Sequence, residues 1–324
     1  MRRTEVQVAK KARKSSTTAA EPDGIGPRQP CPCGSGRRYK ACHGDEGGSA
    51  PYIVRTFEGL PGECDWVALR EFVPAATATV WLREGAYDGT ADGRTVTVTT
   101  VLPGIVAALV RPDAEIRLAV QVSHQSADPS RDFAEALRLA LLGDPGQSVV
   151  MAGLPGPGPR LQDVVEPGSD FTVTVLDGFD FWFDAADQPD AAVAATLENL
   201  NASIDPTQRL GSVEAAYWTS VGTKEHLRWV QPYDEEELLT ALARLHVAGA
   251  DRLGPDSRLV GSFRAHGLLV PVWDLPSGTG AAALEKPASD FGERLADALA
   301  DTSAMTGEQR SARNGLANRQ VTIR

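Results

Sequence analysis

The sequence lacks the short motifs that mark the common enzyme classes. It has no Gly-x-x-x-x-Gly-Lys-[Ser/Thr] loop for nucleotide phosphates, no Gly-x-Ser-x-Gly turn, no His-Glu-x-x-His pair, no kinase set and no Gly-x-Gly-x-x-Gly after a predicted strand. Long apolar runs are also missing: residues 104–110 form one of the longest, and a membrane-spanning helix needs roughly 20 such residues. These absences predict a soluble protein without membrane spans, and they give no support to a motor ATPase, a kinase or a serine hydrolase.

Cysteine and histidine are scarce, with four and five copies in 324 residues. Three of the cysteines lie within thirteen residues of the N-terminal region, and Cys64 is left without a partner. We expect Cys64 to be a small, half-buried hydrophobic residue rather than a nucleophile. The basic N-terminus is followed by Thr, Ala and Glu instead of an apolar signal core, so we expect a cytoplasmic protein.

The cysteine-rich segment predicts a zinc site. It reads Cys31-Pro-Cys33-Gly-Ser-Gly-Arg-Arg-Tyr-Lys-Ala-Cys42-His43. Three thiolates and one imidazole supply the four donors of a closed tetrahedral site, which leaves no open position for water and therefore indicates one structural Zn²⁺. Pro32 fixes an extended turn between the first two thiolates, and the glycines after it let the chain reverse. The alternatives are reduced thiols, or a disulfide beside a spectator histidine, but a disulfide suits a secreted chain better.

This segment resembles the SEC-C motif, the zinc-binding tail of the SecA preprotein translocase ATPase. The resemblance covers residues 29–44 and implies that Cys31, Cys33, Cys42 and His43 hold zinc. It also implies that exposed basic and aromatic residues dock the export chaperone SecB or the ribosome; here these are Arg37, Arg38, Tyr39 and Lys40. The motif lies near the N-terminus, and no phosphate-binding loop follows it, so the chain is not the translocase itself.

More loosely, the whole chain resembles an uncharacterised family of SEC-C-bearing proteins from high-GC bacteria. The resemblance lies in the order of a basic tail, a SEC-C motif and the run Asp-Trp-Val-Ala-Leu-Arg-Glu-Phe-Val-Pro-Ala-Ala-Thr-Ala that begins at Asp65. It implies no activity.

Charge is divided unevenly along the chain. Residues 1–43 hold ten Lys or Arg and three acidic residues, a net charge of +7. Residues 44–324 must therefore carry −18 to give the overall net charge of −11. The basic residues at positions 2–14 could bind RNA, DNA or anionic lipid weakly and in a salt-dependent way. A solvated tail that only aids solubility would explain the same composition.

Pro- and Gly-rich segments divide the chain into expected regions. We expect an α+β protein in which a small zinc knuckle precedes a body of antiparallel hairpins and amphipathic helices. The expected regions are a disordered basic arm (1–28), the knuckle (29–45), one α+β half (52–150), a second α+β half (165–303) and a flexible C-terminal tail (304–324).

The periodicity of the first half predicts strands over 77–82, 95–102 and 115–123. A helix should follow, begun by Asp128-Pro129 and ended by Gly143. The boundary between the halves is expected at the Pro- and Gly-rich residues 153–159.

The second half should contain two hairpins and three helices. Asp177-Gly178 predicts a hairpin of residues 171–176 and 179–183. The other expected elements are a helix over 187–200, a helix over 234–246 with a capping box, a hairpin of 257–264 and 268–273, and a helix over 290–300. The helical segments that start at Asp132 and Asp290 agree at six of ten positions. Duplication into two similar halves would explain this, and so would chance similarity between Ala- and Leu-rich helices.

The body shows no clear catalytic cluster. Its histidines, at positions 124, 226, 246 and 266, are dispersed, and we expect strand, helix-end and turn residues rather than general bases. Three aspartates, at 177, 180 and 184, interleave with aromatic residues. They could line an acidic site beside an aromatic cleft, although a hairpin with Phe inside and Asp outside is a simpler interpretation.

Together these patterns favour a zinc-binding cytosolic adaptor over an enzyme. Its partner would be a protein, either a secretion chaperone or a ribosome-associated factor. The alternatives are a hydrolase with a dispersed site in the acidic body, and RNA or ribosome binding through the basic arm.

Overall fold

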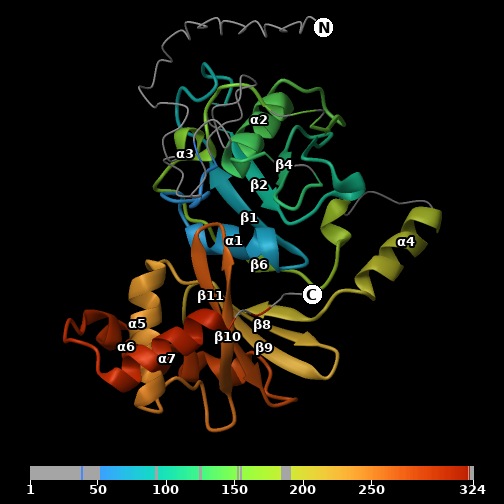
Figure 1. Cartoon of the computed structure of the whole chain (residues 1–324). Helices are drawn as coiled ribbons and strands as arrows, with labels where there is room; N and C mark the ends of the chain where they lie inside the picture. Colours follow the sequence, from blue (N-terminus) through green and yellow to red (C-terminus); the bar gives the residue numbers. More distant parts are fainter. Residues whose placement is uncertain are drawn as a thin grey trace, which may run out of the picture. The chain divides into compact units, whose positions relative to one another are not determined.

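Two β-sheets with their helices make up the described part of the chain (Figure 1). The computed structural model describes residues 38, 52–91, 94–123, 126–151, 153, 155–183, 191–319 and 321. The chain divides into two units between Pro51 and Tyr52, and every helix and strand named below belongs to the second unit. The expected α+β class is confirmed for this unit, whereas the expected arm (1–28) and knuckle (29–45) lie outside the described residues except for Arg38.

The first sheet is mixed and has the strand order β5-β3-β4-β2-β1-β6. All neighbouring strands are antiparallel except β2 and β4, which are parallel. The strands are β1 (Ala76–Trp81), β2 (Thr95–Thr99), β3 (Ala108–Val110), β4 (Ile116–Ala119), β5 (Ser148–Val149) and β6 (Thr174–Val175). Alternating valines and threonines form β2, and its Val96 and Val98 are buried, as a sheet with one packed face requires.

Helices α1 (Glu63–Glu71), α2 (Pro129–Leu141) and the short α3 (Leu161–Val164) accompany this sheet. As expected, Asp128 caps α2 by accepting from the backbone N–H of Arg131, and Pro129 occupies the first turn. Phe133 and Leu137 of α2 are fully buried against the sheet, because they recur on one face of the helix.

The second sheet is antiparallel throughout, with the order β10-β11-β9-β8-β7. Its strands are β7 (Thr207–Arg209), β8 (Ala216–Val221), β9 (Lys224–Trp229), β10 (Arg258–Ala265) and β11 (Leu268–Leu275). Helices α5 (Glu235–Val247), α6 (Glu285–Ala300) and α7 (Gly307–Asn318) pack beside it (Figure 1). Helix α4 (Ala191–Asn201) lies between the two sheets in the sequence.

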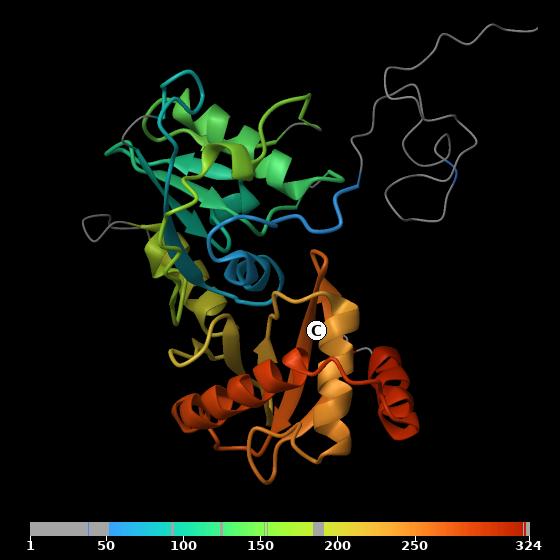
Figure 2. The ribbon, with the colours of Figure 1, turned by 90° about the vertical axis from the view of Figure 1, so that its left-hand side faces the viewer.

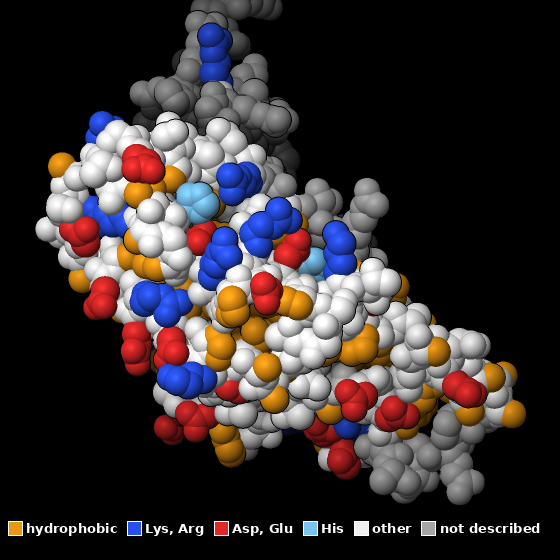
Figure 3. Space-filling view, turned by 90° about the horizontal axis from the view of Figure 1, so that it is seen from below, with side chains coloured by type: hydrophobic (Ala, Val, Ile, Leu, Met, Phe, Trp, Pro, Cys, Tyr) orange, Lys and Arg blue, Asp and Glu red, His pale blue; other side chains and the backbone are white. Residues whose placement is uncertain are grey.

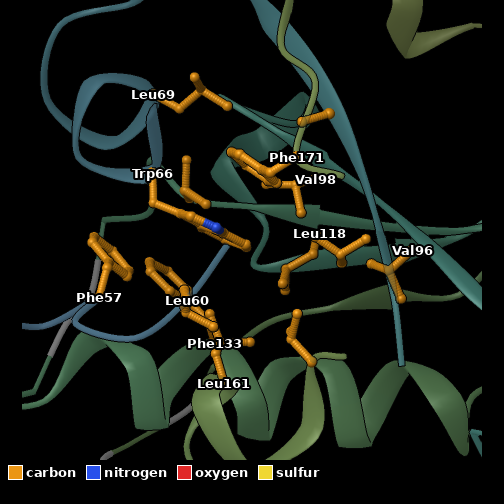
Figure 4. Packing of buried hydrophobic residues seen from close by; sticks show 14 of the residues in the cluster. Phe57, Leu60, Trp66, Leu69, Val96, Val98, Leu118, Phe133, Leu161 and Phe171 are labelled. Carbon is orange, nitrogen blue, oxygen red and sulfur yellow. The ribbon is translucent and has the colours of Figure 1, made fainter. Parts of the chain in front are cut away.

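Helix α1 is buried along most of its length because it lies between the two sheets (Figure 2). On one side Trp66 stacks on Phe171 with ring centroids 4.6 Å apart and contributes to the first core (Figure 4). Beyond its end, Phe72 meets Tyr217 and Phe263 of the second sheet edge-to-face, with centroids 5.7 and 5.9 Å apart. The second sheet thus contributes one face to the core of the first.

The other face of the second sheet forms a separate core with α5, α6 and α7. Trp273 of β11 and Phe291 of α6 meet edge-to-face at 5.1 Å, and Trp229 packs beside both rings. Because both faces of β11 are covered, seven of its eight residues are buried, and its side chains alternate between the two cores.

The hairpin expected at residues 171–183 is wrong. β6 has only two residues and pairs with β1, while Asp180–Trp182 forms a 3₁₀ turn. The reason is aromatic packing: Phe179 stacks on Trp182 with centroids 4.9 Å apart, and the Trp182 indole donates to the carbonyl of Val101 at 3.0 Å. These contacts override the local turn signal of Asp177-Gly178.

The boundary expected at residues 153–159 does not separate the two sheets. The first sheet continues past residues 153–159, because Val165 bridges to Leu82 and β6 completes the edge. Each sheet does place two hairpins side by side, β1-β2 with β4-β3 and β8-β9 with β11-β10. However, β4 runs parallel to β2, whereas β11 runs antiparallel to β9, so the second hairpin has the opposite direction. The two sheets, in which the segments at Asp132 and Asp290 follow corresponding strands, therefore share a strand order but differ in strand direction.

The expected flexible tail over 304–324 is wrong for residues 307–318, which form α7. Thr306 and Gln309 make a reciprocal capping box at its start, and α7 packs against α5. Leu316 is 4% exposed within the second core. Beyond the helix, the backbone N–H of Val321 donates to the carbonyl of Ser262 in β10, and the N–H of Ser262 donates to the carbonyl of Arg319. Sequence periodicity did not indicate this helix, because the segment has few apolar residues and a single buried leucine anchors it.

Leu316→Ala should lower the free energy of unfolding by about 2–3 kcal/mol, since it removes a buried side chain and leaves a cavity. The measurement is equilibrium urea denaturation. The matched control is Leu142→Ala, because Leu142 is 65% exposed, and its effect should stay within about 0.5 kcal/mol. Equal effects of the two substitutions would show that α7 does not contribute to the core.

Candidate functional site

The predicted zinc ligands lie outside the described residues. This applies to Cys31, Cys33, Cys42 and His43, and also to Arg37, Tyr39 and Lys40 of the expected docking surface. Arg38 is described and is exposed. Among the described residues, no three His, Cys, Asp or Glu side chains are grouped as metal ligands. The zinc prediction therefore rests on the donor set and its spacing.

The histidines of the body are spread over separate elements, as the sequence predicts. His226 on β9 lies 3.0 Å from the carboxylate of Asp274, and His246 in the last turn of α5 lies 2.6 Å from that of Asp251. His124 is outside the described residues. Each of these two imidazoles thus lies beside one carboxylate, an arrangement that can orient the ring but does not add a nucleophile.

His266 occupies the turn of the β10-β11 hairpin in a left-handed conformation, with φ 48°. Its Nδ1 lies 3.0 Å from the Thr56 hydroxyl, and its Nε2 lies 2.9 Å from the Glu71 carboxylate. The hydrogen bond with His266 lowers the pKa of Glu71 below its ordinary value. Gly267 follows with φ 81°, and a Cβ there would lie 2.7 Å from the carbonyl oxygen of Val54. The hairpin tip is therefore fitted closely against residues 54–57.

A second polar cluster joins α1 to the second sheet. Arg209 donates to both carboxylate oxygens of Asp65, at 3.0 and 2.9 Å, and the Tyr217 hydroxyl donates to the same group at 2.5 Å. Burial raises the pKa of Tyr217 well above its ordinary value, and the charge of Asp65 acts in the same direction. Asp65 is only 4% exposed, so the cluster is a buried bridge rather than a base open to a substrate.

No sequence pattern indicates this bridge, because Arg209 and Tyr217 lie 144 and 152 positions after Asp65. Asp65 follows Cys64 in a helix whose neighbouring residues are apolar. Burial also raises the pKa of the Cys64 thiol to about 12, which keeps the thiol protonated and unreactive. The side chain, expected to be half-buried, is in fact buried, with 8% exposure.

Two adjoining surface hollows of about 430 and 450 Å³ share Arg252 and Pro255. Their arginines are held by nearby acceptors: Arg252 donates to the Pro255 carbonyl at 2.9 Å, and Arg294 donates to the Arg252 carbonyl at 3.0 Å. Their acidic residues are Asp256, Asp274 and Asp290, and no histidine or cysteine lines them. Ser257 also lines the first hollow, and its hydroxyl accepts from the backbone N–H of Leu253 at 2.8 Å and donates to the carbonyl of Gly254 at 3.0 Å, so its hydrogen bonds are made to backbone groups.

Figure 3 shows one face of the molecule, on which Lys and Arg side chains are interspersed with Asp, Glu and hydrophobic ones. Since neither sign of charge covers that face, it does not resemble a phosphate-binding surface.

The aspartates that interleave with aromatic residues do not form an acidic cleft in the described structure. Phe179 is buried while Asp180 points outward and accepts a hydrogen bond from Asn201 at 3.2 Å. Arg111 and Arg117 donate to the backbone carbonyls of Trp182 and Phe181, respectively. Asp184 lies outside the described residues. The expected inward Phe and outward Asp are therefore present, although a packed 3₁₀ turn replaces the hairpin.

Comparison with protein families divides the chain at the same place as the structure. The SEC-C motif matches residues 28–45, and a family of unknown function, DUF5926, matches residues 56–324. The chain belongs to this family. Searches of curated proteins and of solved structures found no match. No described helix of this DUF5926 member is long and apolar enough to cross a membrane.

His266→Asn should lower the free energy of unfolding by about 1 kcal/mol, because it removes the hydrogen bond to a half-exposed carboxylate. Asn tolerates the left-handed backbone, so the turn itself should persist. The pKa of Glu71 is lower in the folded protein than its ordinary value of 4.5, so the ionised carboxylate stabilises the folded state above pH 4.5. This stabilisation is lost as the pH falls through the folded pKa. The difference between wild type and variant should therefore shrink below about pH 4, measured by urea denaturation between pH 3 and 7. A difference that is constant over this range would contradict a role for Glu71.

Proposed function

We propose that this DUF5926 member is a zinc-binding adaptor that docks a protein partner through its SEC-C knuckle. The observation that carries the proposal is the separation of a complete SEC-C motif, residues 28–45, from a body that begins at Tyr52. A motif outside the folded body is suited to binding a partner without altering the body's packing.

One structural Zn²⁺ suits the donor set of the knuckle. Cys31, Cys33, Cys42 and His43 would hold it, and three thiolates with one imidazole match the preference of zinc for soft and borderline ligands. With four protein donors the ion would stabilise the fold of the knuckle, and no position remains for a reacting water.

The docking surface would consist of Arg37, Arg38, Tyr39 and Lys40. Three cations beside an aromatic ring favour an acidic partner surface, because charge steers encounter while the ring adds contact area. The partner class follows from the SEC-C resemblance: a secretion chaperone or a ribosome-associated protein of the cytoplasm.

An enzyme receives less support from the described residues. The Asp65–Arg209–Tyr217 bridge is buried, the described histidines lie on separate elements, and the hydroxyl of Ser257 in the first hollow is hydrogen-bonded to backbone groups. Nucleic-acid binding through the basic residues 2–14 is a distinct alternative, favoured by the +7 charge of residues 1–43.

Purified protein should carry one zinc ion per chain, and Cys31→Ser combined with Cys33→Ser should remove it. The measurement is elemental analysis after gel filtration, with Cys64→Ser as the control that keeps the metal. The melting of residues 52–324 should change little when zinc is lost, because the ion supplies folding energy to the knuckle alone. A wild-type protein free of zinc, or a chelator that melts the whole chain, would contradict the proposal.

Changing Arg37, Arg38 and Lys40 to Glu should keep zinc bound but weaken partner binding at least about tenfold, because these cations dock and steer the partner. Binding is measured by co-sedimentation with ribosomes and by titration with purified SecB. The matched control changes the exposed cations Lys224, Arg258 and Lys286 to Glu, which alters net charge equally.

Unchanged binding by the knuckle variant would contradict docking through this surface. Ribosome binding that requires residues 2–14 and disappears after nuclease treatment would instead support the nucleic-acid alternative. The control triple variant should behave as wild type in both assays.

A further inference from the structure

A row of polar side chains crosses all five strands of the second sheet. The register pairs Thr207 with Thr219, Thr219 with His226, His226 with Asp274 and Asp274 with Arg258. Residues directly opposite each other across a sheet point to the same face, so the five side chains share one face. The second core lies on the other face, together with α5, α6 and α7 (Figure 2). The polar row therefore faces away from these helices.

Asp274 orients the imidazole of His226 within this row. One of its carboxylate oxygens lies 3.0 Å from Nδ1 of His226, and the other accepts from Arg258 at 3.3 Å. Nδ1 is buried, whereas the side chain as a whole is 19% exposed, so the exposed part of the ring is the part away from Nδ1, which includes Nε2. In the described part of the chain Nε2 makes no hydrogen bond.

Arg228 follows His226 by two residues on β9 and so lies on the same face. Its guanidinium carbon is 5.6 Å from the centroid of the Phe72 ring, and its side chain makes no hydrogen bond or ion pair with the described residues. Burial lowers the pKa of Arg228 below its ordinary value, and the charge of Asp205 opposes this from a distance. The other arginines on the strands of this sheet each lie beside a carboxylate; these are Arg209, Arg258 and Arg264.

The lack of a carboxylate beside Arg228 is notable in an acidic body. Residues 44–324 carry a net charge of −18, so carboxylates outnumber the cations that they can pair with. Tyr217, directly across from Arg228 on β8, already donates its hydroxyl to Asp65. A half-buried guanidinium has several N–H donors, and leaving them without acceptors is unfavourable. A bound anion would supply the acceptors that the described protein groups do not.

We propose that Arg228 and His226 bind the phosphate group of a small molecule. Alternate residues of a strand lie roughly 7 Å apart, a spacing that one phosphate bridges through hydrogen bonds of about 2.8 Å on either side. Asp274 holds a proton on Nδ1 of His226, so Nε2 donates to the phosphate from the imidazolium. Lys224 lies on the same face two residues before His226 and adds positive charge. This site is independent of the SEC-C knuckle and gives the body a ligand of its own.

A phosphate group fits this pair of donors better than a carboxylate or a nucleic acid does. A phosphate monoester carries up to two negative charges and three acceptor oxygens, which match two cationic donors that approach from different sides. A carboxylate carries one charge, and the many carboxylates of the body leave Arg228 unpaired. A nucleic-acid backbone needs positive charge along a whole face, whereas Asp274 and Asp205 lie beside this site. A single phosphate needs only the local donors.

The test uses the full chain labelled with ¹⁵N in its five histidines. The ring signals of His226 are assigned by comparison with His226→Gln. Inorganic phosphate and glycerol 3-phosphate, added at constant ionic strength, should move these signals saturably toward the imidazolium position, because the bound anion favours the charged ring. Acetate should bind at least about tenfold more weakly, since it offers one charge and two oxygens.

Arg228→Gln should weaken binding of glycerol 3-phosphate at least about tenfold, because it removes the guanidinium donors. The matched control is Arg264→Gln, which removes an arginine of the same sheet that pairs with Glu235 and should leave the affinity within about twofold. The ³¹P signal of glycerol 3-phosphate reports binding in every variant, including His226→Gln, which should bind at least about threefold more weakly. Circular dichroism checks that each variant keeps its fold.

If Arg228→Gln does not fold, Arg228→Lys takes its place. Lysine keeps the charge but loses the planar fork of donors, so this variant should bind glycerol 3-phosphate about threefold or more weakly than wild type. A titration with no saturable shift of the His226 signals would overturn the proposal. Equal affinities for acetate and phosphate would overturn it too, as would an equal loss of binding in Arg264→Gln and Arg228→Gln, because the effect would then be one of net charge.

Discussion

The burial of α1 on both sides is the constraint on which the rest of residues 52–324 depends. One side of the helix supplies Trp66 to the first core, and the chain just beyond it supplies Phe72 to the second sheet. A helix in this position has little surface left for polar residues, so Asp65 is tolerated only because Arg209 and Tyr217 complete its hydrogen bonds. The two sheets are therefore joined by apolar packing together with one satisfied polar bridge.

Elements with strong local signals were predictable from the sequence, and those set by distant contacts were not. Alternation in β2 and the cap of α2 at Asp128 depend on neighbouring residues, and both were confirmed. Asp177-Gly178 also carries a strong local signal, but stacking of Phe179 on Trp182 decided the conformation there. No periodicity reveals that two sheets share α1, because that arrangement depends on pairs such as Phe72 and Tyr217.

The candidate sites show the same division between local and distant information. The zinc ligands could be proposed from the sequence because Cys31 to His43 fall in one short motif. The bridge of Asp65, Arg209 and Tyr217 could not, because its members lie 144 and 152 positions apart in the sequence. Only the structure brings these three side chains together in one buried cluster.

The two-sided burial of β11 has a consequence for how the unit can be divided. Removing the first sheet would leave Leu268, Val270 and Val272 in water, and removing α5 to α7 would leave Leu269 and Trp273 there instead. Either fragment would expose one apolar face of β11 to water, and exposed apolar patches of this kind promote aggregation. The two sheets therefore depend on each other for burial of β11, and a cut in the chain between them should destabilise both cores together.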